Sequence, residues 1–111
     1  MREVGQRVGA ILGAKEGIVE FLGYGVYEGD HIPEEAVGFM ADASRVCKWT
    51  NPRIRLDSGK VVYGCECWWG SEAKVKVQLA EYRASGYRIV EVDIDAIRKK
   101  YADGEINDKK R

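Results

Sequence analysis

Apolar and polar positions alternate in several segments of the chain, which is the pattern of half-buried β-strands. Residues 4–12 alternate up to a polar corner at 15–17, and a run of branched and aromatic residues follows from 18 to about 27. We expect these two segments to pair as a hairpin. Gly23 and Gly25 interrupt the second segment, and they predict a bulge or a close approach of another backbone.

Helical spacing recurs in three other segments. Apolar positions after Pro33 predict a helix over 33–47, which must end before Pro52 because the residue preceding a proline is pushed out of the helical region. Ser71 is a suitable N-cap for a second helix that ends at Ser85-Gly86. Asp95 can cap a short last helix that carries Ile97, Arg98 and Tyr101.

A second hairpin is predicted over 53–69, with Ser58-Gly59 as a two-residue turn, and a further strand over 87–93. The order β-β-α-β-β-α-β-α, with links short enough for hairpins, predicts an α+β fold. We expect a single antiparallel sheet of about five strands with two or three helices packed on one face. Residues 1–111 are interpreted as a single domain, with 105–111 as a polar tail that frays.

Composition restricts the function. Eighteen basic and eighteen acidic residues give a formal charge of zero, so no field of the whole molecule attracts a nucleic acid polymer or an anionic membrane. No apolar segment approaches the roughly 20 residues of a membrane span, and the start of the chain lacks the apolar stretch of a signal peptide. We therefore expect a cytoplasmic protein in which any anionic ligand is held by a local cluster.

Cys47, Cys65 and Cys67 are too few and too irregularly spaced for a disulfide framework. With the lone His31 they offer four potential zinc ligands, but no second Cys pair exists, and we expect buried free thiols and no metal or cofactor. No Ser-His-acid arrangement is evident, so the expectation is a protein that is not an enzyme. Acid–base chemistry by Asp30, Glu66 or Glu28 stays open, because carboxylates need only a suitable pocket.

The glycine-rich segment Gly-Tyr-Gly-Val-Tyr-Glu-Gly-Asp at 23–30 is not a dinucleotide fingerprint, since the third glycine is replaced by Glu28. One interpretation is structural, with glycines in a bulge and tyrosines as strand residues. The other is a pocket bordered by Tyr24 or Tyr27, in which Asp30 accepts a hydrogen bond from a ligand hydroxyl.

The second hairpin carries the other candidate site. Its alternation places Arg53, Arg55, Glu66 and Trp68 on one face, near Asn51, with Gly64 opposite Arg53. We expect the other face to be core, formed by Ile54, Leu56, Tyr63, Cys65, Cys67 and Trp69. Arginine for phosphate, tryptophan for a base, and Asn or Glu for polar edges suit a nucleotide. The alternative is a solvated face with an Arg–Glu ion pair, and a one-residue change of register would exchange the two faces.

A third cluster lies at the start of the last helix. Asp93 and Asp95 can pair as carboxylates or cap the helix, and capping is the interpretation that we favour. Arg98 is a candidate second phosphate ligand if that helix folds over the sheet or over a partner subunit.

These segments together resemble small phage-encoded proteins. The stretch 23–30, the stretch Asn-Pro-Arg-Ile-Arg-Leu-Asp-Ser-Gly-Lys-Val-Val-Tyr-Gly-Cys-Glu-Cys-Trp-Trp-Gly at 51–70, and Val-Asp-Ile-Asp-Ala-Ile-Arg at 92–98 are similar to the phage sponge family of Thoeris anti-defense proteins. The resemblance spans roughly residues 8–101. It implies a non-catalytic, homo-oligomeric α+β protein in the infected bacterial cytoplasm that sequesters a cyclic ADP-ribose derivative made by immune enzymes.

We therefore predict a protein that binds a cyclic nucleotide immune signal without cleaving it. The candidate ligand-binding residues are Tyr24, Tyr27, Asp30, Asn51, Arg53, Arg55, Glu66, Trp68 and Arg98. Two alternatives stay open. One is a small nucleotide-degrading hydrolase that uses Asp30 or Glu66, and the other is a protein-interaction module anchored by Trp68 and Trp69.

Overall fold

The computed structural model describes residues 3–104, so the prediction for the tail at 105–111 lies outside the described part of the chain. No helix within 3–104 has the length and apolar character that a bilayer crossing requires. The elements follow the order β1 (Arg7–Lys15), β2 (Ile18–His31), α1 (Phe39–Cys47), β3 (Asn51–Leu56), β4 (Val61–Tyr63), β5 (Trp68–Ser71), α2 (Glu72–Ala84), β6 (Arg88–Glu91) and α3 (Ile94–Ala102).

The predicted first hairpin is confirmed. β1 and β2 pair antiparallel from Arg7 opposite Val26 to Lys15 opposite Ile18. The two residues between them, Glu16 and Gly17, both have positive φ (54° and 79°), as a tight turn with the twist of the strands requires.

β2 extends beyond the predicted end near residue 27, to His31, and it bends at its two glycines, as expected. One edge of β2 pairs with β1, whereas the other pairs with β6 over Ile18–Phe21 and with β3 from Gly25 onward. Gly23, with φ of 134°, lies between these two pairings at a shift of register. A Cβ at Gly25 would lie 2.2 Å from the carbonyl oxygen of Arg55, so the close approach predicted for this segment is made by β3.

The second hairpin has a different register from the predicted one. Arg55 lies opposite Val61 and Arg53 opposite Tyr63, instead of opposite Val62 and Gly64. The cause is the turn, because Leu56 N–H donates to the carbonyl of Lys60 and leaves a three-residue loop that ends in Gly59 at φ of 95°. The shift places Tyr63 on the face of Arg53.

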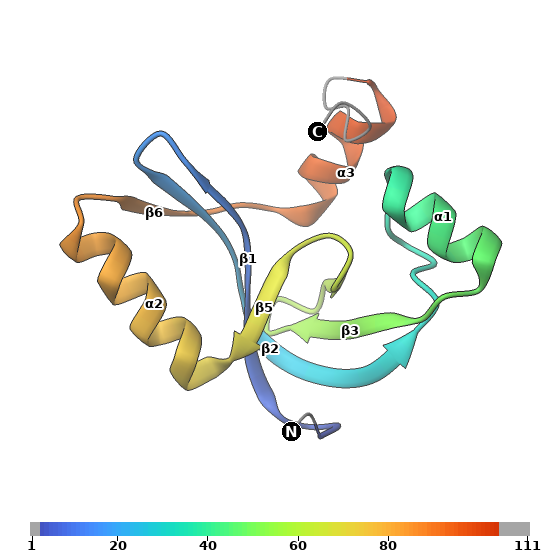
Figure 1. Cartoon of the computed structure of the whole chain (residues 1–111), viewed down its shortest axis with the longest axis horizontal. Helices are drawn as coiled ribbons and strands as arrows, with labels where there is room; N and C mark the ends of the chain where they lie inside the picture. The colour runs from blue at the N-terminus through green and yellow to red at the C-terminus, as the bar shows by residue number, and fades with distance from the viewer. Residues whose placement is uncertain (1–2, 105–111) are drawn as a thin grey trace.

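The α+β class is confirmed, with one sheet in the order β4-β3-β2-β1-β5, antiparallel except where β6 pairs parallel with β2. The expectation that the helices share one face is wrong. Val75 and Leu79 of α2 pack with Ile11 of β1, whereas Ile94 and Ile97 of α3 pack with Val8 and Ala10, which point to the opposite side of the same strand. Figure 1 shows α2 and α3 on opposite sides of the bent sheet.

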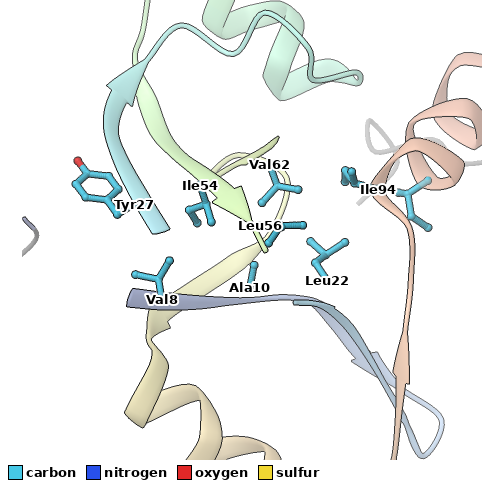
Figure 2. Close-up of a cluster of buried hydrophobic side chains, with 9 residues drawn as sticks. Val8, Ala10, Leu22, Tyr27, Ile54, Leu56, Val62 and Ile94 are labelled. Carbon is cyan, nitrogen blue, oxygen red and sulfur yellow. The ribbon is translucent and has the colours of Figure 1, made fainter. Parts of the chain in front are cut away.

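The largest core cluster lies on the concave side of this sheet, beneath α3. Its buried side chains come from five elements, as Figure 2 shows for most of them: Val8, Ala10, Leu22, Tyr27, Ile54, Leu56, Val62, Ile94 and Ile97. Ile54 and Leu56 are core residues as predicted. The cluster joins β1, near the start of the chain, to α3, near its end. Each apolar side chain that it removes from water contributes about 1.5–3 kcal/mol to the stability of this contact.

The helix boundaries are confirmed in part. α2 begins after Ser71, whose hydroxyl accepts from Lys74 N–H, and it ends before Gly86. α1 begins only at Phe39, because Gly38 has φ of 122°, so residues 33–38 are not helical. α3 is capped by Asp93, which accepts from Asp95 N–H, and not by Asp95.

Candidate anion-binding site

Two arginines of β3 lie together on the outer face of the sheet, and we call Arg53 and Arg55 the arginine pair. They point to one side because they alternate with the buried Ile54. One carboxylate joins them, since Glu28 of β2 has its oxygens 3.0 Å from Arg53 Nε and 2.9 Å from Arg55 Nε. The Arg55 side chain is 48% exposed and that of Arg53 is 26% exposed. At a partly open surface the two positive charges thus share Glu28, and Glu35 adds a second, longer ion pair to Arg53 at 3.9 Å.

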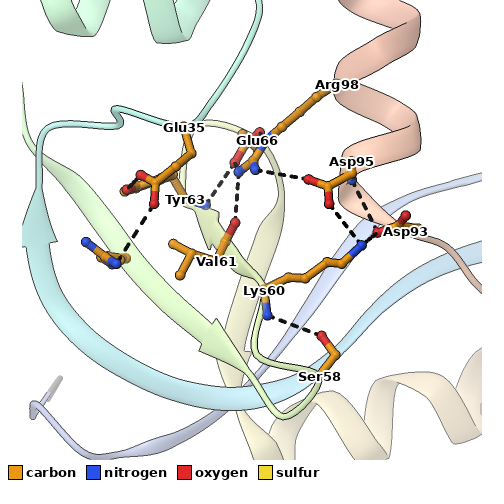
Figure 3. A network of polar contacts seen from close by, with 10 residues as sticks. Glu35, Ser58, Lys60, Val61, Tyr63, Glu66, Asp93, Asp95 and Arg98 are labelled. Carbon is orange, nitrogen blue, oxygen red and sulfur yellow. Dashed lines mark hydrogen bonds and ion pairs between the residues drawn. The ribbon is translucent and has the colours of Figure 1, made fainter.

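Tyr63 and Glu35 adjoin the arginine pair on the side of α1. The buried Tyr63 hydroxyl donates a short hydrogen bond to Glu35, and the Glu35 carboxylate lies 3.9 Å from Arg53 (Figure 3). Burial and the Glu35 carboxylate raise the pKa of Tyr63 to about 12. The hydrogen bond from Tyr63 in turn lowers the pKa of Glu35, against the effect of burial. Tyr63 therefore fills the room that a glycine opposite Arg53 would have left.

Arg98 and Glu66, which we call the buried pair, bind each other instead of facing solvent. Arg98 Nε and Nη2 donate to the two Glu66 oxygens at 2.9 and 2.8 Å, and Nη2 also donates to the carbonyl of Val61 at 2.8 Å (Figure 3). Their side chains are 12% and 7% exposed. Burial alone would lower the pKa of Arg98, but the hydrogen bonds and charge of Glu66 raise it overall.

Glu66 was predicted on an open strand face, and this is wrong. Residues 64–67 form a turn, in which Glu66 N–H donates to the carbonyl of Tyr63 and the Glu66 carboxylate accepts from Tyr63 N–H. The turn folds the carboxylate inward beneath α3. Arg98 and Glu66 are thus committed to joining α3 to the sheet.

The acidic residues before α3 form a third ionic group. Lys60 Nζ lies 2.6 Å from Asp93 and 2.9 Å from Asp95, which raises the pKa of Lys60 and lowers that of Asp93 (Figure 3). Asp93 also caps α3, as the favoured interpretation predicted. These groups hold the loop after β3 against α3.

A fourth group separates the arginine pair from α2. Arg7 donates to both oxygens of Asp57 at 2.7 and 2.8 Å and to Glu72 at 2.9 Å. Glu72 also lies 3.7 Å from Lys76, so the two carboxylates of this group are balanced by two cations.

The tyrosines of the glycine-rich segment lie on opposite sides of β2. Tyr27 is buried, stacks on Trp69 with ring centroids 5.4 Å apart, and donates to Asp30 at 2.7 Å. Tyr24 points to the outer side, where it packs on Phe21 and lies 5.6 Å from Lys76 of α2. Of the predicted ligand residues Tyr24, Tyr27 and Asp30, only Tyr24 lies on the same face of the sheet as the arginine pair.

Of the two remaining predicted site residues, Asn51 follows the same alternation on β3 but is engaged by α1, and Trp68 lies on another strand. Asn51 donates to the hydroxyl of Ser44 in α1 at 3.2 Å. Trp68 is exposed on β5 beside Gly70 and Lys74, and two strands separate it from β3. Trp69 packs against the core cluster, so the predicted division between a surface tryptophan and a structural one is confirmed.

The thiols differ from the expectation in one respect. Cys67 and Cys65 are partly buried, and burial raises the pKa of both, that of Cys65 to about 11. Cys47, in contrast, is exposed on α1. Within residues 3–104, no three or more His, Cys, Asp or Glu side chains are placed to hold a metal ion.

Sequence reasoning missed Glu28 and Glu35 as partners of the arginines and Tyr63 as their neighbour. The signal for Tyr63 was the three-residue turn ending in Gly59, which changes the register by one position. Glu28 has no comparable signal, because it falls where the β2–β3 register shifts between Tyr27 and Asp30. Comparison of the chain with protein-family models, curated proteins and solved structures finds no match.

Proposed function

We propose that this protein binds a nucleotide of the cyclic ADP-ribose class and holds it uncleaved, as the resemblance to the phage sponge family implies. The observation that carries the proposal is the arginine pair with its shared Glu28. Two adjacent guanidinium groups match a pyrophosphate, because each can donate two parallel hydrogen bonds to phosphate oxygens.

The proposed binding reaction is an exchange of anions. Arg55 is half-exposed and donates to Glu28 and, weakly at 3.4 Å, to the carbonyl of Gly59. A pyrophosphate carries more charge than one carboxylate, so it can displace Glu28 and retain both arginines. Tyr24 lies on the same face, where its ring packs against Phe21 and under Lys76, so a base could stack on it only by displacing Lys76. Arg98, Glu66 and Tyr27 do not belong to this proposed site, since each is engaged inside the fold.

Retention without cleavage is favoured over hydrolysis by the engagement of the candidate acids. Glu66 is paired with Arg98, and Asp30 accepts from Tyr27. A general acid or base needs a position within hydrogen-bond reach of the reacting group. Neither carboxylate lies at the arginine pair. Glu28, the third candidate acid, does lie there, but both guanidinium groups bind it, so it would have to leave them before it could act.

The test is a retention experiment with cyclic ADP-ribose. The protein is incubated with the nucleotide and filtered, the free nucleotide is measured, and the retained fraction is released by heat and chromatographed. We expect depletion of free nucleotide and recovery of the intact compound. Arg55→Ala should reduce retention at least about tenfold, the worth of a charged hydrogen bond, whereas Arg83→Ala, on the exposed surface of α2, should leave it unchanged.

Two results would count against the proposal. Unchanged free nucleotide with the wild-type protein would refute binding of this class. Recovery of a cleaved product would instead identify the hydrolase that the sequence left open.

A further inference from the structure

The two strands that end the order β4-β3-β2-β1-β5 differ in how their outer edges are covered. β4 is closed, since all three of its residues are buried, the Val61 carbonyl accepts from Arg98, and Tyr63 N–H donates to Glu66. None of the four residues of β5 is buried, and among residues 3–104 no strand pairs with its outer edge. In an antiparallel ladder, alternate residues direct both N–H and C=O away from the partner strand. β5 therefore presents backbone groups on the side away from β1.

β5 lacks the features that usually keep an exposed edge from pairing. Its sequence, Trp-Trp-Gly-Ser, contains no charged residue and no proline. Its pairing with β1 runs from Trp68 to Ser71 without a bulge. Proteins normally protect an exposed edge with such features, because a row of unpaired backbone groups is a template for another strand. The edge of β5 is therefore suited to the addition of a strand.

Two glycines at this edge are not required by the fold itself. Eight of the thirteen glycines have positive φ, and Gly9, Gly25 and Gly64 have no room for a Cβ. The other two are Gly70, in β5, and Gly13, in β1 just beyond the end of its pairing with β5. A Cβ at Gly70 would meet its nearest atom at 3.6 Å, an ordinary contact distance, and one at Gly13 would meet nothing within 4 Å. A glycine within a strand often marks the close approach of another backbone.

The side chains beside β5 indicate the composition of the added strand. Trp68 is 42% exposed, and its Cη2 lies 3.6 Å from the position of a Cβ at Gly70, so the ring extends along the strand. The stem of Lys74 reaches the same position, with Cδ at 3.9 Å, and Lys74 is exposed and forms no ion pair with another residue of the range 3–104. An apolar side chain suits Trp68 and a carboxylate suits Lys74. Because both contacts lie on one face of β5, the added strand would supply them at alternate positions.

From these observations we infer that the outer edge of β5 binds an extended segment of another protein, which adds to the sheet as a further strand and carries an apolar and an acidic side chain at alternate positions. Backbone hydrogen bonds would supply affinity, and Trp68 and Lys74 would select the sequence. The inference does not depend on the proposed nucleotide binding, because β1 and β2 separate β5 from the arginine pair on β3.

The test is selection from a phage-displayed library of random short peptides, followed by fluorescence anisotropy with the enriched peptides in synthetic form. We expect the enriched peptides to carry Asp or Glu two positions from an aromatic or branched residue. Lys74→Glu should change this preference to Lys or Arg. The matched control is Lys76→Glu, the same change on the side of α2 that faces Tyr24, which should keep the preference for acidic peptides.

Two further measurements separate the tryptophan contact from the backbone contact. Trp68→Ala should weaken binding of an enriched peptide at least about tenfold, because tryptophans dominate interface energies. Trp49→Ala, at a 55% exposed position just beyond α1, should bind like the wild type, and melting curves should show both variants folded. N-methylation of alternate peptide amides should abolish binding for one of the two alternate sets and spare the other.

Several results would overturn the inference. They are a selection that enriches no peptide, an acidic preference that persists in Lys74→Glu, and equal binding of both N-methylated sets. A wild-type oligomer that dissociates in Trp68→Ala, as measured by light scattering, would also overturn it, because a second copy would then occupy the edge of β5.

Discussion

The arginine pair and the buried pair use the same chemical groups in different surroundings. Arg55 and Arg98 each donate to a glutamate at 2.9 Å, yet the Arg55 side chain is 48% exposed and that of Arg98 is 12% exposed. At the surface, a carboxylate can be exchanged for another anion with little cost, since exposed ion pairs contribute about 0–1 kcal/mol. In the interior, loss of one partner leaves a buried charge. Burial therefore decides which of these arginines is available to a ligand.

The largest expected difference between the two regions is in stability. We expect Glu66→Gln to lower the free energy of unfolding by about 3 kcal/mol, because Arg98 keeps its charge without a buried counter-ion. Glu28→Gln, the identical change at the arginine pair, should cost less than about 1 kcal/mol. Urea unfolding of both variants measures the difference, and equal losses would show that burial does not distinguish the two pairs.

Tyr63 lies between the regions and gives a pH-dependent test. Burial raises its pKa from 10.0 to about 12, so the folded state keeps a proton that the unfolded state loses above pH 10. Stability should therefore fall between pH 10 and 12 by on the order of 1.4 kcal/mol per pH unit. Tyr63→Phe removes this contribution, and its unfolding free energy should decline less over the same range. A parallel decline of the two proteins would place the Tyr63 hydroxyl in contact with water.

Glu35 should have a smaller effect at the acid end. Its pKa is lowered from 4.5 by the hydrogen bond from Tyr63, so its contribution is present above pH 4.5 and is lost as the pH falls through its lower folded-state value. Its side chain is 44% exposed, and we expect less than about 1 kcal/mol. The gap in urea midpoint between wild type and Glu35→Gln should close on acidification. A gap that is constant from neutral to acid pH would contradict the assignment.

The fold was more predictable from the sequence than the site. The first hairpin, α2 with its Ser71 cap and the α+β class follow from local signals such as turn residues, caps and alternation. The register of the second hairpin was not predicted, because it changes with a single residue of loop length. The loop that ends at Gly59 has three residues instead of two, and it therefore places Tyr63 opposite Arg53.

The ion pairs were less predictable still. Glu66 was expected at the surface because strand alternation was extended through a segment that is a turn. The pairing of Arg98 with Glu66, 32 residues apart, depends on how α3 lies over the sheet, and local patterns carry no such information. The placement of α2 and α3 on opposite faces of the sheet could not be predicted for the same reason, because local sequence patterns do not say which face a helix covers.

Calorimetric titration with cyclic ADP-ribose tests the central claim most directly, namely that the arginine pair is an anion-binding site that Glu28 occupies in the free protein. Glu28→Gln removes the competing charge and should bind about tenfold more tightly than the wild type. Arg55→Ala should bind at least about tenfold more weakly than the wild type, and Glu72→Gln, next to Arg7, should match the wild type. Equal affinity of Glu28→Gln and wild type, or binding that persists undiminished in Arg55→Ala, would contradict the claim.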